Sequence, residues 1–198
     1  MNRLIKPIFE SWRSDFTRVI DCGYDVDIYD EILASVIDGD IMQPLNTGGE
    51  SFVWKHIDGD KVVKSTSTRL LGVSCDYEVN ADFWCRSLKT YNKVFPESKI
   101  TPIAFCIIEN DSSYFMTTQK FIEGTDATEE EIRRDLRKRG FRPCKNKETG
   151  YSRNIYFDGY YLIDDVRESN VIKSGGEFFY IDVGCYIVNN PDNYEFID

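Results

Sequence analysis

The feature that most constrains this chain is a pattern of acidic and amide side chains in its last third. Asp165 is followed five residues later by Asn170, and a segment with Gly175 and Gly176 then leads to Asp182-Val183-Gly184. Apolar residues on both sides of the glycine pair predict a hairpin over residues 170–181. The pattern therefore places an Asp before this hairpin, an Asn at its start and a second Asp directly after it.

This spacing is typical of metal-assisted phosphoryl transfer. In that chemistry one Asp orients the attacking hydroxyl, while an Asn and a second Asp hold Mg²⁺ against the phosphates. Oxygen atoms are the ligands that Mg²⁺ prefers. Ordinary loop and turn residues explain the same pattern equally well when it is taken alone, because short acidic and glycine patterns recur by chance.

A second signal lies upstream, where Gly48 and Gly49 separate two expected strands. Small residues in such a turn let backbone N–H groups approach phosphate oxygens. Lys64 ends the next expected strand, from which its side chain could reach phosphates, and Glu78 on the following helix could fix its direction. Taken alone, a tight hairpin with an exposed lysine and a solvated glutamate is the simpler interpretation.

Hydrophobic periodicity predicts an α+β chain. Thr128 and Glu131 have the spacing of a capping box, which makes the helix that they begin the clearest element. Helices are expected over residues 4–20, 29–37, 75–94 and 128–140. Strands are expected over residues 41–45, 51–57, 61–64, 103–108, 114–122, 155–157, 160–163, 170–172 and 178–181.

Charge and composition argue against several classes of protein. The 198 residues include 24 Lys+Arg and 34 Asp+Glu, a net charge of −10 that disfavours binding to nucleic acid or an acidic membrane surface. No apolar stretch suits a signal peptide or a membrane span, so we expect a cytoplasmic protein. Six scattered cysteines and one histidine disfavour a zinc site or a Ser-His-Asp triad and predict buried, reduced thiols.

The order of these motifs resembles the protein-kinase-like family over about residues 45–184. Residues 45–53 are similar to its glycine-rich loop, Lys64 to its strand lysine and Glu78 to the helix partner of that lysine. Residues 115–124 are similar to the strand and hinge that hold adenine. The resemblance is closer to the short polyvalent protein kinases of phages and mobile elements, through residues 119–124, 127–132, 140–141 and 151–163.

The resemblance implies a minimal two-lobed kinase-like fold. Residues 1–40 would form an N-terminal helical extension, residues 41–124 a strand-rich nucleotide-binding lobe and residues 125–198 a reduced lobe with the catalytic and metal loops. A cytoplasmic location would be that of the host if a phage encodes the chain.

The implied function is ATP- and Mg²⁺-dependent phosphoryl transfer to a hydroxyl of a protein or a small molecule. The expected catalytic residues are Asp165, Lys64 and Arg167, and the expected Mg²⁺ ligands are Asn170 and Asp182. The expected nucleotide-binding residues are Gly48, Gly49, Ser51, Val53, Lys64, Glu78, Gln119 and Phe121. The alternative is a nucleotide-binding pseudokinase that acts as an interaction or regulatory protein.

Several positions depart from the family pattern. Asn46 and Ser51 stand where glycines are usual, and Ile163-Asp164 replaces the His-Arg that precedes the catalytic Asp. Arg167 replaces a lysine or histidine, and we expect it to contact the transferred phosphate. Only residues 185–198 follow the metal loop, so we expect no activation loop and no helical platform for a peptide.

A run of basic residues over 133–139 is expected to be a solvated helix face, although it is the one basic patch in the sequence. Lys145, Lys147 and Arg153 would enlarge this patch if the fold brought them together.

Overall fold

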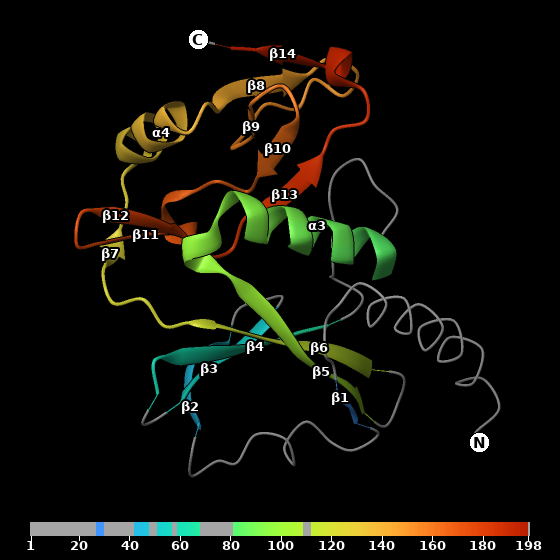
Figure 1. Ribbon diagram of the computed structural model, residues 1–198, viewed down its shortest axis with the longest axis vertical. Helices are drawn as coiled ribbons and strands as arrows, with labels where there is room; N and C mark the ends of the chain where they lie inside the picture. The colour runs from blue at the N-terminus through green and yellow to red at the C-terminus, as the bar shows by residue number, and fades with distance from the viewer. Residues whose placement is uncertain are drawn as a thin grey trace, which may run out of the picture. The chain divides into compact units, whose positions relative to one another are not determined.

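The computed structural model describes residues 27–29, 42–47, 51–56, 59–67, 81–108 and 112–197 (Figure 1). These residues form two compact units. The first comprises the described residues up to Cys85 together with Ile100–Phe121, and the second comprises Arg86–Lys99 and the residues from Ile122 onward. Helices and largely antiparallel sheets occur together, which confirms the predicted α+β class. No helix in the described ranges is long and apolar enough to cross a membrane.

The first unit contains a six-stranded sheet. All neighbouring strands are antiparallel except the first pair, which is parallel. The order is β1 (Asp27–Tyr29), β5 (Ile100–Ile108), β6 (Ser112–Lys120), β4 (Lys61–Ser67), β3 (Ser51–His56) and β2 (Met42–Thr47).

The register of this sheet determines which side chains share a face. Val53 of β3 lies opposite Lys64 of β4, which lies opposite Thr117 of β6. Directly paired residues point to the same face, as do residues two apart along a strand. Phe115 therefore shares the face of Lys64, and its ring contacts Trp84 of α3 (Ala81–Val94) with centroids 4.1 Å apart. Helix α3 thus begins over the face that carries the lysine.

The predicted N-terminal helical extension is not supported where the structure describes it. The expected second helix begins at Tyr29, yet residues 27–29 form β1 and pair with residues 104–106 of β5. Pairing with a distant strand outweighs the local helical spacing here, as tertiary context commonly does. The other residues of 1–40 lie outside the described ranges, as do Gly48, Gly49 and Glu78.

The second unit contains two sheets. The five-stranded sheet has the order β13 (Gly184–Ile187), β10 (Tyr161–Asp164), β9 (Tyr156–Phe157), β8 (Arg142–Asn146) and β14 (Tyr194–Phe196). The three-stranded sheet has the order β12 (Glu177–Tyr180), β11 (Val171–Ser174) and β7 (Thr125–Asp126). Its β11–β12 hairpin confirms the expected one, and Gly175 and Gly176 form its turn with φ of 59° and 87°.

Helix α4 (Glu129–Lys138) begins as the sequence predicts. Thr128 is the N-cap, its hydroxyl accepts the N–H of Glu131, and the Glu131 carboxylate accepts the N–H of Thr128. Ile132 and Leu136 are buried beneath the helix. Three short 3₁₀ segments complete the unit, η1 (Pro96–Ser98), η2 (Glu168–Asn170) and η3 (Pro191–Asn193). Cys85, Cys144 and Cys185 are buried free thiols, as expected.

Candidate functional site

The centre of the candidate site is the loop that follows β10. Strand β10 ends at Asp164, and the next residue, Asp165, has a left-handed backbone with φ of 52°. Among the non-glycine residues that the structure describes, only Asn154 shares a positive φ with it. Such a conformation is unfavourable for most side chains and is maintained only where the surroundings enforce it. The Asp165 side chain is 51% exposed, so a hydroxyl group in solvent could reach it.

Asn170 connects this loop to the Asp182 loop. Its side-chain Nδ2 lies 2.9 Å from the backbone oxygen of Asp165, 2.9 Å from Oδ2 of the same residue and 2.9 Å from the backbone oxygen of Asp182. Asn170 itself is only 4% exposed. The structure therefore brings together Asp165, Asn170 and Asp182, the three residues that the spacing singled out.

Arg167 lies in the same loop and forms an ion pair with Asp165, with Nη2 and Oδ2 3.2 Å apart. Both side chains are about half exposed, so solvent screens this pair and its contribution to stability is small. The guanidinium is thus held beside the candidate catalytic carboxylate without being committed to a buried structural role.

The oxygen atoms of Asn170 and of the Asp182 loop are suitable ligands for a hard cation. Asn170 uses its N–H groups for the protein contacts, while its Oδ1 has only a long contact of 3.4 Å with the Ser169 hydroxyl. Asp182 supplies a carboxylate. Within the described residues there is no group of three or more His, Cys, Asp or Glu side chains that could hold a metal ion. Mg²⁺ is usually bound through one or two carboxylates and otherwise by water and phosphate, so an Asp and an Asn fit it.

Asp164, to which the sequence assigned no role, lies at the end of β10 directly before Asp165. Burial, reinforced by the neighbouring charge of Asp165, raises the pKa of its carboxyl to about 6, although the Tyr186 hydroxyl and the Gly184 N–H donate hydrogen bonds that oppose this shift. A Cβ at Gly184 would overlap Oδ1 of Asp164 and the Tyr186 hydroxyl. Asp164 of β10 lies directly opposite Gly184 of β13, so only a residue without a Cβ fits at position 184 beside the Asp164 side chain.

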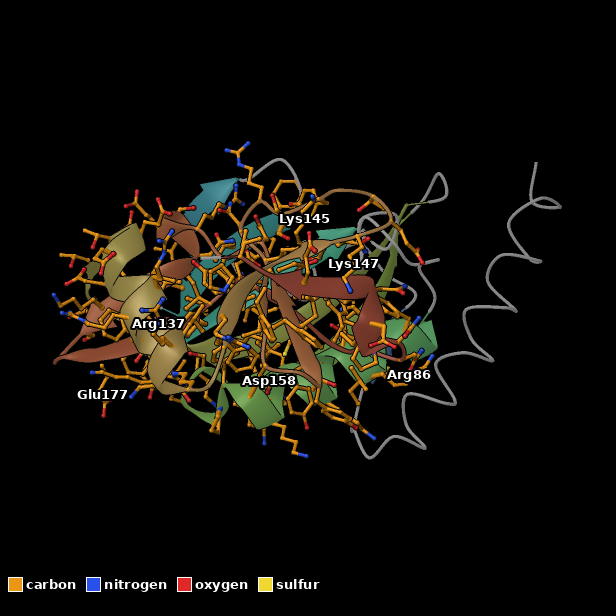
Figure 2. All side chains as sticks on the ribbon, turned by 90° about the horizontal axis from the view of Figure 1, so that it is seen from above. Arg86, Arg137, Lys145, Lys147, Asp158 and Glu177 are labelled. Atoms are coloured by element: carbon orange, nitrogen blue, oxygen red, sulfur yellow. The ribbon has the colours of Figure 1, made fainter. Side chains whose placement is uncertain are left out.

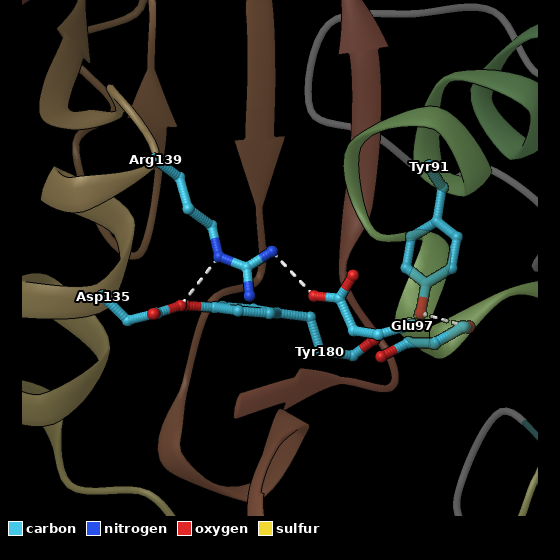
Figure 3. Close-up of polar contacts among 6 residues, drawn as sticks. Tyr91, Glu97, Asp135, Arg139 and Tyr180 are labelled. Atoms are coloured by element: carbon cyan, nitrogen blue, oxygen red, sulfur yellow. Dashed lines mark hydrogen bonds and ion pairs between the residues drawn. The ribbon is translucent and has the colours of Figure 1, made fainter. Parts of the chain in front are cut away.

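A polar and aromatic cluster supports the strand that leads to Asp182 (Figure 3). The Arg139 guanidinium lies over the rings of Phe95 and Tyr180 and pairs with Asp135 at 2.8 Å and with Glu97 at 2.6 Å. The Tyr180 hydroxyl donates to Asp135 at 2.9 Å. The sequence predicts that the basic run 133–139 is a solvated helix face. Arg139 differs from this prediction, because its side chain contacts Tyr180 and pairs with Asp135 and Glu97.

The backbone of Tyr180 is fixed as well as its ring. The Tyr91 hydroxyl donates hydrogen bonds to the carbonyl oxygens of Tyr180 and Ser98. The next residue, Ile181, donates its N–H to the Asn170 carbonyl at 2.9 Å. Asp182 thus follows two residues with fixed positions: the ring and the carbonyl of Tyr180 and the N–H of Ile181 are all held by contacts. No local sequence signal marks this cluster, because its members come from four separate elements.

The expected nucleotide-binding residues that the structure describes lie in the first unit. Val53 and Lys64 are opposite one another, and the Ser51 hydroxyl contacts the Thr66 hydroxyl at 2.8 Å. Gln119 is buried opposite Val62 on the same face. Gly48, Gly49 and Glu78 lie outside the described residues, so their predicted roles stay predictions.

Phe121, the residue that follows β6, contacts a cation of β3 that the sequence did not single out. Phe121 donates its N–H to the Asp60 carbonyl, and the Lys55 ammonium lies 3.9 Å from the centroid of its ring. Phe121 is therefore anchored to the turn before β4 and to β3. Its predicted role beside a nucleotide stays a prediction.

Comparison with known proteins gives one family. The profile of a family described as serine/threonine/tyrosine kinase found in polyvalent proteins matches residues 12–189. The match covers every site residue named above. Searches of curated proteins and of solved structures found no match to this chain.

Proposed function

Because the chain belongs to the family of serine/threonine/tyrosine kinases found in polyvalent proteins, we propose that it transfers the γ-phosphoryl group of ATP, with Mg²⁺, to a hydroxyl of a protein or a small molecule. Kinase-like phosphoryl transfer is the activity of the family, whereas the cofactors and the acceptor are our proposal. The observation that carries it is the Asn170 amide, which joins Asp165 to the backbone of Asp182.

Each expected site residue of the second unit has a role in this proposal. Asp165 orients the acceptor hydroxyl and takes its proton, for which its half-exposed carboxylate is accessible. Arg167, already paired with Asp165, contacts the γ-phosphate as that proton is taken. Asn170 and Asp182 would hold Mg²⁺, which when bound would neutralise charge on the phosphate oxygens.

In the first unit, Lys64 would bind the α- and β-phosphates and Glu78 would orient it. Gly48, Gly49, Ser51 and Val53 would cover the phosphates and the sugar, while Gln119 and Phe121 would contact adenine. A nucleotide-binding lobe over residues 41–124 and a catalytic lobe over residues 125–198 are part of the same proposal. A cytoplasmic location, in a phage host if a phage encodes the chain, also stays a prediction.

Thermal unfolding with ATP tests nucleotide and metal binding directly. A ligand that binds only the folded protein raises the unfolding midpoint, with about 2.7 kcal/mol of stabilisation at a hundredfold excess over Kd. We expect ATP with Mg²⁺ to raise the midpoint, and Asp182→Ala to lose the Mg²⁺-dependent part of the increase. Asp192→Ala, an exposed carboxylate in η3, is the matched control and should respond as the native chain does. No response at millimolar ATP would reject the nucleotide-dependent function.

A second variant separates an enzyme from a nucleotide-binding pseudokinase. Asp165→Asn removes the proton acceptor but keeps a side chain of the same shape, so nucleotide affinity should be retained while turnover falls by at least about a hundredfold. Turnover is measured by release of ADP in the presence of candidate hydroxyl acceptors. ATP binding with no turnover in the native chain under any of these conditions would favour the pseudokinase.

A further inference from the structure

Positive charge is concentrated in one segment of an otherwise acidic chain. Residues 133–153 include nine Lys and Arg but only two acidic residues, a net charge of +7, which leaves −17 for the rest of the chain. Some of these cations have partners, since Arg133 pairs with Glu129 and Arg139 with Glu97 and Asp135. Arg142 lies over the Phe196 ring and Lys145 forms a long, exposed pair with Glu195. The position of the other cations determines what they can bind.

Three of the cations lie at the end of β8 and in the folded-back connection to β9, and we call Lys145, Lys147 and Arg153 the basic tip. Asn146 donates its N–H to the Tyr151 carbonyl at 2.8 Å, and Cys144 donates its N–H to the Ile155 carbonyl at 3.2 Å. These bonds fold residues 147–154 back beside the end of β8. In Figure 2, Lys145 and Lys147 lie near each other, and Arg137 of α4 lies at a separate place.

The side chains of the basic tip are accessible. Lys147 and Arg153 are exposed, and neither side chain has an ion pair or hydrogen bond with any residue that the structure describes. Lys145 pairs with Glu195 at 3.6 Å, but both side chains are more than two-fifths exposed and the pair is weak. Glu148 is the other acidic residue at the tip. Three cations against two carboxylates leave the tip with a positive charge.

The basic tip adjoins the catalytic loop. Asn154, the residue after Arg153, accepts the N–H of Val166, the residue after Asp165, at 3.1 Å. Asn154 and Asp165 are also the two non-glycine residues with positive φ in the described part of the chain. The backbone that presents Arg153 is therefore bonded to the backbone that presents the candidate catalytic carboxylate.

We propose that the basic tip binds an acidic segment of a protein acceptor, so that hydroxyls flanked by Asp or Glu are the preferred acceptors. This inference rests on the proposed function and deepens it by naming the class of acceptor. The catalytic loop contains Asp165 and Glu168, and Asp164 precedes it; these acidic residues repel an acidic segment. Cations beside this loop offset that repulsion and attract the segment to it.

Two other ligands fit the basic tip less well. Small-molecule sites are concave and bury most of the ligand, whereas these cations stand exposed on a strand end and a turn. A nucleic acid carries about one charge per 1.7 Å of duplex, and the charge of −17 outside residues 133–153 would repel so dense a polyanion. A short acidic protein segment needs only the local cations.

Binding of labelled peptides to the full chain tests the inference without relying on catalysis. The probes are fluorescein peptides with a central Ser, Thr or Tyr flanked on both sides by Glu, by Gln or by Lys, measured by anisotropy at low salt. We expect the Glu-flanked peptides to bind most tightly. The double variant Lys147→Glu/Arg153→Glu should weaken their binding about tenfold, because two attractive charges become repulsive.

The matched control is Lys89→Glu/Lys99→Glu, which reverses two exposed cations elsewhere in the same unit and should leave peptide binding unchanged. Equal affinity for Glu- and Gln-flanked peptides, or an equal loss in the control variant, would overturn the inference. Tight binding of a single-stranded DNA oligonucleotide that the tip variant abolishes would also overturn it, in favour of a nucleic-acid surface.

Turnover of the same peptides distinguishes failure of the inference from failure of the proposed function. For the Glu-flanked peptides we expect the tip variant to raise KM with kcat nearly unchanged, and turnover of the Gln-flanked peptides to stay as in the native chain. Phosphorylation of all peptides with equal kcat/KM would overturn the inference alone. Glu-selective binding through the tip without any phosphorylation would overturn the proposed function, but it would still support the basic tip as a binding surface for acidic segments.

Discussion

At the scale of the residue, the fold changes the acid–base chemistry of Asp164. Burial and the adjacent Asp165 raise its pKa from 3.8 to about 6. Between these two values the folded chain binds more protons than the unfolded chain, so the contribution of Asp164 to stability falls as the pH rises through this range. Above about pH 6 the cost of its buried charge is fully present. The sequence shows only an Asp where an Arg is usual, because the pKa depends on β13 residues brought across from a distant segment.

This shift predicts a pH dependence that one substitution removes. Asp164→Asn eliminates the ionisation, so stability relative to the native chain should increase by about 1–2 kcal/mol from pH 4 to pH 7. Urea unfolding at four pH values measures the difference. Asp192→Asn, an exposed carboxylate, is the control and should parallel the native chain. A constant difference between Asp164→Asn and the native chain would contradict the buried charge.

At the scale of elements, the connection after β6 depends on a close backbone approach. A Cβ at Gly124 would overlap the Lys173 carbonyl oxygen and Cγ2 of Ile172, both on β11. Gly124→Ala should therefore destabilise the second unit by about 1–3 kcal/mol, since β7 and β11 must separate to admit a methyl group. Thermal unfolding measures the loss. Gly→Ala at an uncrowded position normally stabilises by about 0.4–1 kcal/mol, so an unchanged or higher midpoint would contradict the close approach.

The capping box of α4 supplies a second prediction at this scale. Thr128→Ala removes the hydroxyl that accepts the Glu131 N–H and should cost about 1 kcal/mol. Thr128→Ser keeps the acceptor and is the matched control. Denaturant unfolding of the two variants compares them. If Thr128→Ala and Thr128→Ser were equally stable, the cap would contribute nothing.

Elements with a strong local pattern could be predicted, and elements defined by distant partners could not. The α4 cap and the Gly175-Gly176 hairpin are local, and both are confirmed. The sequence predicts no strand at β8, because its residues Arg-Pro-Cys-Lys-Asn contain little apolar surface. Pairing with β9 and β14 stabilises it. In the site, spacing identified Asp165, Asn170 and Asp182. The hydrogen bonds of the Asn170 amide and the Arg139 cluster depend on the fold and left no sequence signal.

At the scale of the whole molecule, salt should affect two properties in opposite directions: the stability of a chain with a net charge of −10, and the binding of acidic peptides to the basic segment 133–153. Self-repulsion of a charged chain destabilises its compact state, and salt screens that repulsion. We therefore expect the unfolding midpoint to rise between 0.02 and 0.3 M NaCl, on the order of a few degrees. Salt also screens attraction between the basic tip and an acidic segment, so binding of the Glu-flanked peptide should weaken over the same range.

The opposite signs of these two responses make the prediction specific. A general effect of salt on folding would change peptide binding and stability together, whereas whole-chain repulsion and a local basic surface require stability to rise while affinity falls. KCl in place of NaCl controls for an effect of the sodium ion. A midpoint that falls with salt would mean that ion pairs such as Arg139 with Glu97 outweigh the repulsion of the whole chain. An affinity that does not fall would mean that the peptide binds through uncharged contacts and not through the basic tip.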